Sequence, residues 1–290
     1  MNTKSFTTDK TATGGRVSMI IPYAYFTKQL DSHIKSDDAF CYELLKTVIK
    51  NPERYTGLFR LSNAKTKLIQ NVTQSREIKF GNFMEEMITD YIAAMGYKNM
   101  EKHIGCGDDG KPLNADQVFL NPWDKSQLCL IEQKMRDDHD STKKRGQYAN
   151  FQKKYTLLKS QHPDSQVFAI MWFIDDSLKR NRFYYQEQAA QNSQPGIYVH
   201  VLYGKELFHE FFRRPDVWEE LCGHLLRNKI ERSSEILSVP DFDTSSEMLT
   251  ALRTLKREEP RLYKRLLSPS PAYEQLRREL FPTEQNLREV

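Results

Sequence analysis

Apolar positions at helical spacing predict amphipathic helices in three parts of the chain. Between residues 37 and 49 they fall on one stripe, which ends at Asn51-Pro52. Between residues 80 and 95 they form a stronger stripe, followed by Gly96 as a C-cap. The segment from 141 to 161 is polar and basic, but four of its positions share one apolar stripe: Tyr148, Phe151, Tyr155 and Leu158.

Short apolar runs predict strands in the middle of the chain. Residues 113–120 and 127–135 flank a turn-rich sextet at 121–126, a pattern that predicts an antiparallel hairpin. The run 167–174 is continuously apolar and is bounded by charged and turn residues, which is typical of a buried strand. Residues 197–202 alternate weakly and predict a further strand.

This order of helices and strands indicates an α/β fold with a central mixed β-sheet flanked by helices. Helical patterns run from Gly204 to Asn228 and again from Phe242 onward, where several prolines interrupt them. We expect one compact domain made of four consecutive regions: a mobile tail at 1–15, a helical region at 16–79, a core at 80–208 and a second helical region at 209–290.

The composition narrows the class of protein. With 290 residues, 39% of them hydrophobic, and a mean hydropathy of -0.69, the chain is typical of a globular protein rather than a disordered or membrane protein. Pro22 interrupts the apolar stretch 17–26, which predicts neither a membrane span nor a signal segment. The four cysteines are widely separated and form no metal-binding spacing, so we expect a reducing cytoplasm and disfavour zinc.

The candidate chemistry lies in the predicted hairpin. If Leu120 and Gln127 close the turn, Asp116 lies opposite Ile131 or, with a slip of one residue, opposite Glu132. Two carboxylates on neighbouring strands repel each other unless a cation lies between them, and Mg²⁺ is a hard cation that prefers such oxygen ligands. Lys134 is two residues beyond Glu132 and therefore projects from the same face of the strand.

These residues resemble a known motif. Asp116 followed by Glu132-Gln133-Lys134 is similar to the D…(D/E)-x-K core of the PD-(D/E)XK nuclease superfamily, although Ala115 stands where a proline usually precedes the aspartate. The helix segment from Gly81 to Glu85 resembles the helix with an acidic residue that often precedes this core. Together with its size and the polar run from Arg136 to Gln147, the chain most resembles a type II restriction endonuclease over residues 80–208.

The resemblance implies a function and a set of site residues. It implies Mg²⁺-dependent hydrolysis of phosphodiester bonds, with Asp116, Glu132 and the backbone carbonyl of Gln133 as metal ligands and Lys134 as the residue that activates or orients water. Glu85 is the expected accessory carboxylate, with Glu86 as an alternative. The structural alternative for the main residues is a partly exposed salt-bridge triad on a sheet.

A basic segment follows the predicted catalytic strand. From Lys134 to Lys154 there are seven Lys or Arg against three Asp, which favours a surface that binds DNA phosphates, or else a solvated helical face. His139 is a candidate general base or ligand, but it equally fits a polar loop formed by its aspartate neighbours. The candidate DNA-binding residues are Arg136, Lys143, Lys144, Arg145 and Gln147.

The resemblance also implies partners. A type II restriction endonuclease binds double-stranded DNA, acts at a short palindromic sequence as a homodimer, and has a cognate DNA methyltransferase as its genetic companion. A repair or recombination nuclease of the same superfamily is one alternative. The other is a DNA-binding protein without catalysis, for which salt-sensitive binding without Mg²⁺-dependent cleavage would be the signature.

Overall fold

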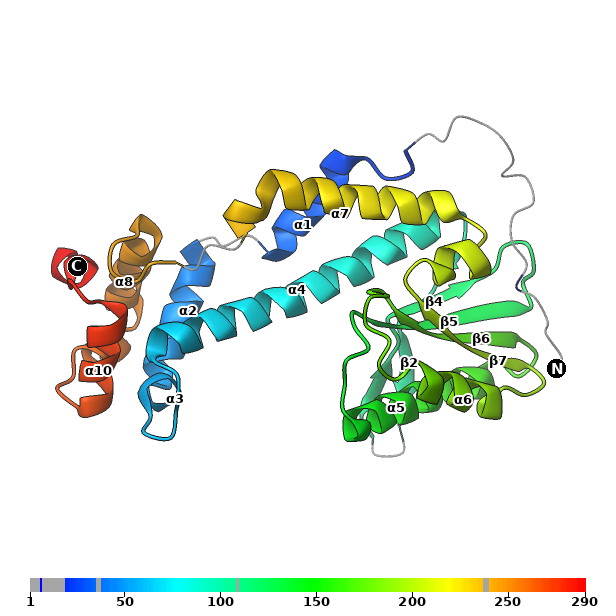
Figure 1. Cartoon of the computed structure of the whole chain (residues 1–290), viewed down its shortest axis with the longest axis horizontal. Helices are drawn as coiled ribbons and strands as arrows, with labels where there is room; N and C mark the ends of the chain where they lie inside the picture. Colours follow the sequence, from blue (N-terminus) through cyan, green and yellow to red (C-terminus); the bar gives the residue numbers. More distant parts are fainter. Residues whose placement is uncertain (1–5, 7–18, 35–37, 108–109, 237–239) are drawn as a thin grey trace. The chain divides into compact units, whose positions relative to one another are not determined.

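The computed structural model describes residues 6, 19–34, 38–107, 110–236 and 240–290 (Figure 1). Packing divides the chain into two compact units, one formed by residues 1–27 and 81–227 and the other by residues 28–80 and 228–290. The sequence patterns predict one domain of consecutive regions, whereas each unit here combines two segments that are far apart in the sequence. Local sequence patterns do not indicate which distant segments will pack together.

A mixed five-stranded sheet forms the centre of the first unit, with the strand order β1-β4-β5-β6-β7. The pairs β1–β4 and β4–β5 are antiparallel, while β5–β6 and β6–β7 are parallel. This confirms the predicted fold class. The strands are β1 (Lys98–Asn99), β4 (Gln117–Leu120), β5 (Gln127–Lys134), β6 (Gln166–Phe173) and β7 (Ile197–Tyr203). A separate two-stranded sheet pairs β2 (His103–Cys106) with β3 (Pro112–Asn114).

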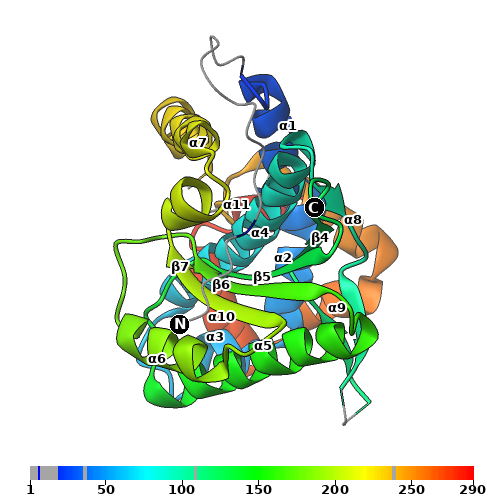
Figure 2. The same cartoon turned by 90° about the vertical axis from the view of Figure 1, so that its right-hand side faces the viewer.

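Helices supply the crossovers between the parallel strands. α5 (Ser141–Gln161) connects β5 to β6, and α6 (Arg182–Asn192) connects β6 to β7. Both helices lie against the same face of the sheet (Figure 2). The predicted apolar stripe of α5 is buried against apolar side chains of β5 and β6, including Leu128, Leu130, Val167 and Ala169. The helix prediction for 141–161 is therefore confirmed, and its burial explains why the stripe is there.

Aromatic side chains cover the opposite face of the sheet. The ring of Phe168 in β6 lies 6.1 Å from the ring of Phe211, and the ring of Trp172 lies 5.9 Å from that of Phe208. Phe208 and Phe211 belong to η1 (Leu207–Phe211), a short π-helix directly after β7. The predicted helical pattern from 204 to 228 is therefore interrupted, because Arg213 takes a positive φ of 58° before α7 (Pro215–Ile236) begins.

The tail expected at residues 1–15 includes a residue that packs in the core. Phe6 is only 9% exposed, and its ring stacks 4.3 Å from that of Phe211 and 5.8 Å from that of Tyr97. This contact of Phe6 with the aromatic face of the sheet was not predicted, because its polar sequence neighbours do not reveal it, and the mobility of the segment stays a prediction. The other residues of the tail lie outside the described part of the chain.

The helical segments of the second unit enclose their own apolar core. α2 (Asp38–Lys50) was predicted almost to the residue, and its Leu45 and Ile49 are fully buried together with Leu252 and Leu255 of α8 (Ser246–Glu258). As the proline pattern after Phe242 predicts, this end of the chain is broken into short helices. They are α9 (Pro260–Leu266), α10 (Pro271–Leu280) and α11 (Gln285–Glu289).

The helix predicted at 80–95 begins earlier than expected. α4 runs from Ala64 to Ala94 and passes from the second unit into the first. Its early part buries only Ala64, Leu68 and Val72, a weak stripe that the sequence analysis did not detect. The predicted end is confirmed, since Gly96 has a φ of 91° and its N–H donates to Ala93.

α1 (Tyr23–Ile34) and α3 (Glu53–Thr56) lie in the region expected to be helical, although their bounds were not predicted, and α6 was not predicted. No helix among the described residues is both long enough and apolar enough to cross a membrane.

Candidate active site

Asp116 lies immediately before β4 and faces β5. Its Oδ2 accepts a 2.6 Å hydrogen bond from the backbone N–H of Gln133. The strands pair Gln117 with Ile131, so the same register continued by one residue sets Asp116 opposite Glu132. Of the two registers left open by the sequence, the pairing of Asp116 with Ile131 is wrong. The slipped register brings the two carboxylates together.

Glu132 is buried, with 4% of the residue exposed, and its carboxylate binds two ammonium groups. Oε1 accepts a 2.7 Å hydrogen bond from Nζ of Lys134, and Oε2 accepts a 2.6 Å hydrogen bond from Nζ of Lys154. Lys134 projects from the same face of β5 as Glu132, as the two-residue spacing predicts. Lys154 comes from α5, whose buried residues pack against that face of β5. Each carboxylate oxygen of Glu132 therefore has its own cationic partner.

The electrostatics reflect this crowding. Burial and the neighbouring Glu132 raise the pKa of Asp116 to about 6, despite the opposing effect of Lys134. Burial alone would lower the pKa of Lys134, but the adjacent carboxylates of Glu132 and Asp116 outweigh it and hold that pKa above its usual value. Lys134 therefore remains charged, and a cation near Asp116 favours the ionised form of its carboxyl group.

The ammonium of Lys134 lies among the three oxygens that could bind a metal cation. It lies 2.7 Å from Oε1 of Glu132, 2.9 Å from the backbone oxygen of Gln133 and 3.6 Å from Oδ2 of Asp116. These are the three oxygens proposed as metal ligands, and two carboxylates with a carbonyl suit Mg²⁺. Among the described residues, no three His, Cys, Asp or Glu side chains form a metal cluster. The donor set thus fits an ion that takes its remaining ligands from water and substrate.

Glu85, the expected accessory carboxylate, lies on α4 beside this site. Its Oε1 accepts a 2.6 Å hydrogen bond from Lys102, and its backbone oxygen accepts one of 2.7 Å from the side chain of Gln117. Gln117 directly follows Asp116, so this hydrogen bond connects α4 to the residue next to the candidate ligand. The side chain of Glu85 is engaged with Lys102 in this structure, and its accessory role stays a prediction, as does that of the exposed Glu86.

The loop after β5 is organised by a buried carboxylate. Asp137 is fully buried and accepts hydrogen bonds of 2.8 Å from both the backbone and side-chain nitrogens of Asn181, and one of 2.9 Å from the hydroxyl of Tyr203. Asp140 caps α5 by accepting hydrogen bonds from the N–H groups of Thr142 and Lys143. These bonds support the polar-loop interpretation of this segment.

His139 belongs to the same loop. Its Nδ1 lies 3.4 Å from Asp138, and its backbone oxygen accepts a hydrogen bond from Asn181. Burial, and secondly the nearby Lys143, lower the pKa of His139, so its ring is neutral at physiological pH. Among the described residues, His139 makes no hydrogen bond or ion pair with Asp116 or Glu132, so its role as base or ligand stays a prediction.

The candidate DNA-binding residues gather where α5 begins. Arg136, Lys143 and Arg145 are exposed. The Nζ of Lys144 lies 4.6 Å from the ring centroid of Tyr184, and Gln147 accepts a hydrogen bond from Tyr185, so these two side chains also contact α6. Their role in binding DNA stays a prediction.

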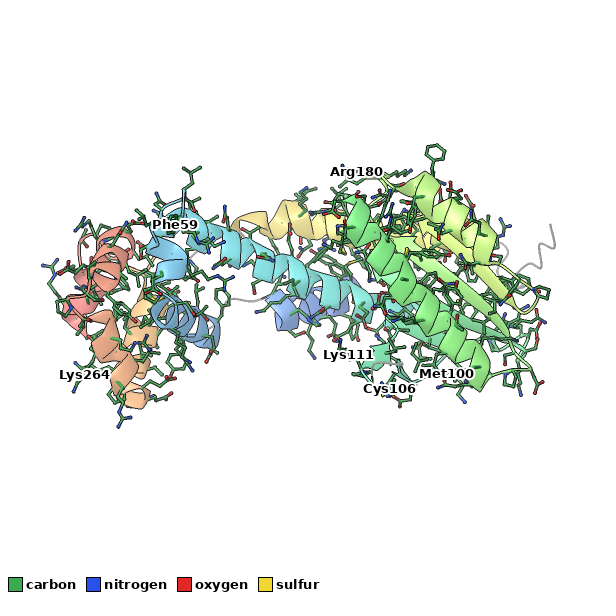
Figure 3. The ribbon with its side chains drawn as sticks, turned by 90° about the horizontal axis from the view of Figure 1, so that it is seen from below. Phe59, Met100, Cys106, Lys111, Arg180 and Lys264 are labelled. Carbon is green, nitrogen blue, oxygen red and sulfur yellow. The ribbon has the colours of Figure 1, made fainter. Side chains whose placement is uncertain are left out.

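Arg180 adds a cation at the same place, which the sequence analysis did not identify. Its backbone N–H donates to Asp137, and it is labelled beside one end of α5, the green helix in Figure 3.

Lys154 was not predicted as a site residue, since it was counted only as one cation of the basic segment. The signal was present in the helical pattern. Lys154 follows Phe151 by three residues and precedes Leu158 by four, so it shares their buried face. A lysine on a buried stripe requires a charged partner, and that partner is Glu132.

The mixed sheet, its crossover helices and the acidic pair beside Lys134 together define the core of a restriction endonuclease. A comparison with protein families agrees: the model described as "Type II restriction endonuclease, HinfI" matches residues 25–107 and 109–227. The chain belongs to this family, so it is a type II restriction endonuclease that cleaves DNA site-specifically. The match extends well beyond the residues 80–208 that carried the resemblance. Comparison with individually curated proteins gave no match.

Proposed function

We propose that this endonuclease hydrolyses phosphodiester bonds of double-stranded DNA with Mg²⁺ held by Asp116, Glu132 and the backbone carbonyl of Gln133. The observation that carries the proposal is the position of the Lys134 ammonium, which contacts one oxygen of each of these three residues. When bound, Mg²⁺ lowers the pKa of a water and neutralises charge that develops on the phosphoryl oxygens.

The side chains have separate tasks in this proposal. Lys134 is 26% exposed, so its flexible stem lets the ammonium move from Glu132 to an attacking water or a phosphoryl oxygen. Asp116 is fixed by the N–H of Gln133, and Glu132 by Lys154, so both carboxylates keep their orientation. Water adds to phosphorus while the bond to one ester oxygen breaks, leaving a phosphate on one fragment and a hydroxyl on the other.

The basic start of α5 supports a role in holding the substrate. Lys143, Lys144 and Arg145 lie at the N-terminal end of the helix, where backbone N–H groups and cationic side chains both favour a phosphate. These contacts would hold the DNA backbone without reading its sequence.

The enzyme class supports a proposal for the assembly and partners. A homodimer with twofold symmetry presents two equivalent sites to a palindromic sequence, so we propose this assembly. A cognate methyltransferase would protect the DNA of the host. The enzyme would then act on unmodified DNA in the cytoplasm of a bacterial or archaeal cell.

The test is cleavage of unmethylated phage DNA in Mg²⁺ and in EDTA by the native protein and by the variants Glu132→Ala and Lys134→Ala. The expected result is discrete fragments that require Mg²⁺ and disappear in both variants. Sequencing the fragment ends then gives the recognition site, whose symmetry tests the palindrome. The control is Lys125→Ala, an exposed lysine in the turn before β5, which should cleave normally.

Each other outcome has a defined meaning. A Mg²⁺-dependent smear would favour a repair or recombination nuclease. DNA binding without cleavage by the native protein would contradict the catalytic assignment. Cleavage by Glu132→Ala at the native rate would remove this residue from the site.

A further inference from the structure

Lys154 differs from Lys134 in how firmly it is held against Glu132. The side chain of Lys154 is 7% exposed and that of Lys134 is 26% exposed. Lys154 extends from the buried face of α5, between Phe151 and Leu158, which are themselves buried. Lys134 reaches the same carboxylate from the exposed end of β5. An incoming cation can therefore displace the ammonium of Lys134, whereas that of Lys154 stays in place.

The charges of the site cancel when no ion is bound. Asp116 and Glu132 bring two negative charges, and Lys134 and Lys154 bring two positive charges within hydrogen-bonding or ion-pairing distance of them. The neighbouring pair of Glu85 and Lys102 adds no net charge. A divalent cation gains little on entering a neutral group of charges, since repulsion from two ammonium groups offsets attraction to two carboxylates. A DNA phosphate would add the missing negative charge.

We propose that Lys154 is a positioning residue whose fixed positive charge keeps the free enzyme's affinity for divalent cations low and makes metal loading depend on the bound DNA phosphate. This inference rests on the proposed metal site. It explains why each carboxylate oxygen of Glu132 binds its own lysine. The ammonium of Lys134 can be displaced by a cation, and that of Lys154 stays in place. The benefit is that the hydrolytic site is completed only on DNA.

Thermodynamic coupling between two ligands is reciprocal, so the charge of Lys154 should also affect DNA binding. If bound DNA raises the affinity for the cation, the cation raises the affinity for DNA by the same factor. Removing the charge of Lys154 should raise the affinity of the free protein for the cation and reduce this coupling.

The experiment is a calorimetric titration of the full-length protein with Mg²⁺, without DNA. Lys154→Met keeps an unbranched stem of similar length without charge. Lys154→Gln keeps an N–H donor without charge, and Lys154→Arg keeps the charge. The matched control is Lys153→Met, which removes the charge of the adjacent exposed lysine. Circular dichroism establishes that each variant is folded, and the Gln and Arg variants carry the test if the Met variant does not fold.

If the inference is right, the Met and Gln variants bind Mg²⁺ at least about tenfold more tightly than the native protein, because one repelling charge has gone. The Arg variant and the Lys153 control bind as the native protein does. Met and Gln variants that bind no more tightly, or a Lys153 control with the same gain, would overturn the inference. An Arg variant that behaves like the Gln variant would indicate a role in packing rather than in charge.

A second measurement examines the coupling with DNA. Fluorescence anisotropy gives the affinity for a duplex with and without Ca²⁺, a divalent cation used here in place of Mg²⁺. The expected gain in DNA affinity with Ca²⁺ is large for the native protein and several-fold smaller for Lys154→Gln. Equal gains in the two proteins would contradict the inference.

Failure of the inference is distinguishable from failure of the proposed metal site. Adding Glu132→Gln to Lys154→Met should abolish the gained Mg²⁺ affinity if Glu132 is a ligand. If the double variant binds Mg²⁺ as tightly as Lys154→Met, the proposed site is wrong. If cleavage requires Mg²⁺ and Glu132 but the Lys154 variants gain no affinity, only the inference fails.

Discussion

The Asp116 carboxylate accepts a 2.6 Å hydrogen bond from the backbone N–H of Gln133, the residue between Glu132 and Lys134. This bond ties the residue before β4 to the end of β5 and holds two carboxylates side by side. Burial, and secondly the proximity of Glu132, raise the pKa of Asp116 to about 6, so the ionisation of this carboxyl group costs free energy of folding.

That cost predicts a pH-dependent effect of Asp116→Asn on stability. Because the pKa in the folded state lies above the unfolded value of 3.8, the native protein loses stability as the pH rises from about 4 through 6. The neutral amide of the variant does not ionise, so the variant does not lose stability over this pH range. In EDTA it should therefore be more stable than the native protein at pH 8, by on the order of 1–3 kcal/mol. At pH 4 this advantage should vanish.

Urea unfolding at both pH values measures this difference. Asp138→Asn is the control, because the side chain of Asp138 is half exposed and lies outside the acidic pair. A variant at Asp116 that is equally destabilised at pH 4 and pH 8 would mean that its ionisation does not oppose folding. The same variant should lose cleavage, since the amide is a poorer cation ligand than a carboxylate.

Asp137→Asn is expected to destabilise the protein strongly. Asp137 is fully buried and accepts hydrogen bonds from Asn181 and Tyr203, and the new amide would point a donor at other donors. The expected loss in the free energy of unfolding is about 2–4 kcal/mol, measured by urea denaturation. The exposed neighbour provides the comparison, since Asp138→Asn should change stability by less than about 0.5 kcal/mol. Equal effects of the two substitutions would contradict the structural role of Asp137.

Removing cations at the start of α5 should weaken DNA binding in a salt-dependent way. Lys143→Ala and Arg145→Ala should each lower the magnitude of the slope of log K against log salt by about 0.9, the contribution of one phosphate contact. The control is Lys125→Ala, at the other end of β5, a strand that spans about 23 Å at roughly 3.3 Å per residue. Electrophoretic mobility shifts at several salt concentrations give the slopes. Slopes unchanged by the helix substitutions would exclude phosphate contacts at this surface.

Phe6→Ala should destabilise the first unit, although its position near the N-terminus suggests no such role. The ring of Phe6 lies within 6.5 Å of five aromatic rings, which are those of Tyr97, Phe119, Phe168, Phe211 and Phe212. Truncation should cost about 1–3 kcal/mol in the free energy of unfolding, because the aromatic contacts of the ring are lost. Phe183→Ala removes a ring that is 89% exposed and should have little effect. Thermal unfolding that is the same for both variants would show that the ring of Phe6 does not stabilise the first unit.

Much of the fold was predictable because burial imposes a period on the sequence. The continuous apolar run of β6 and the stripes of α2 and α5 were identified from their spacing alone, since each must place one face or both against a core. Glu132 and Lys134 were predictable as neighbours for the same reason, because residues two apart on a strand share a face. What depended on local periodicity was therefore determined by the sequence.

The arrangement of distant residues was decided by the tertiary structure. The turn between β4 and β5 set the register that places Asp116 opposite Glu132, and a slip of one residue would have moved the carboxylate to the other face. Lys154 binds Glu132, 22 residues away in the sequence, because α5 packs against β5. Phe6 contacts aromatic rings from four separate segments of the chain. A sequence pattern reports which side chains must be buried. Only packing in three dimensions determines which of them meet, because that depends on how the crossovers and turns bring remote segments together.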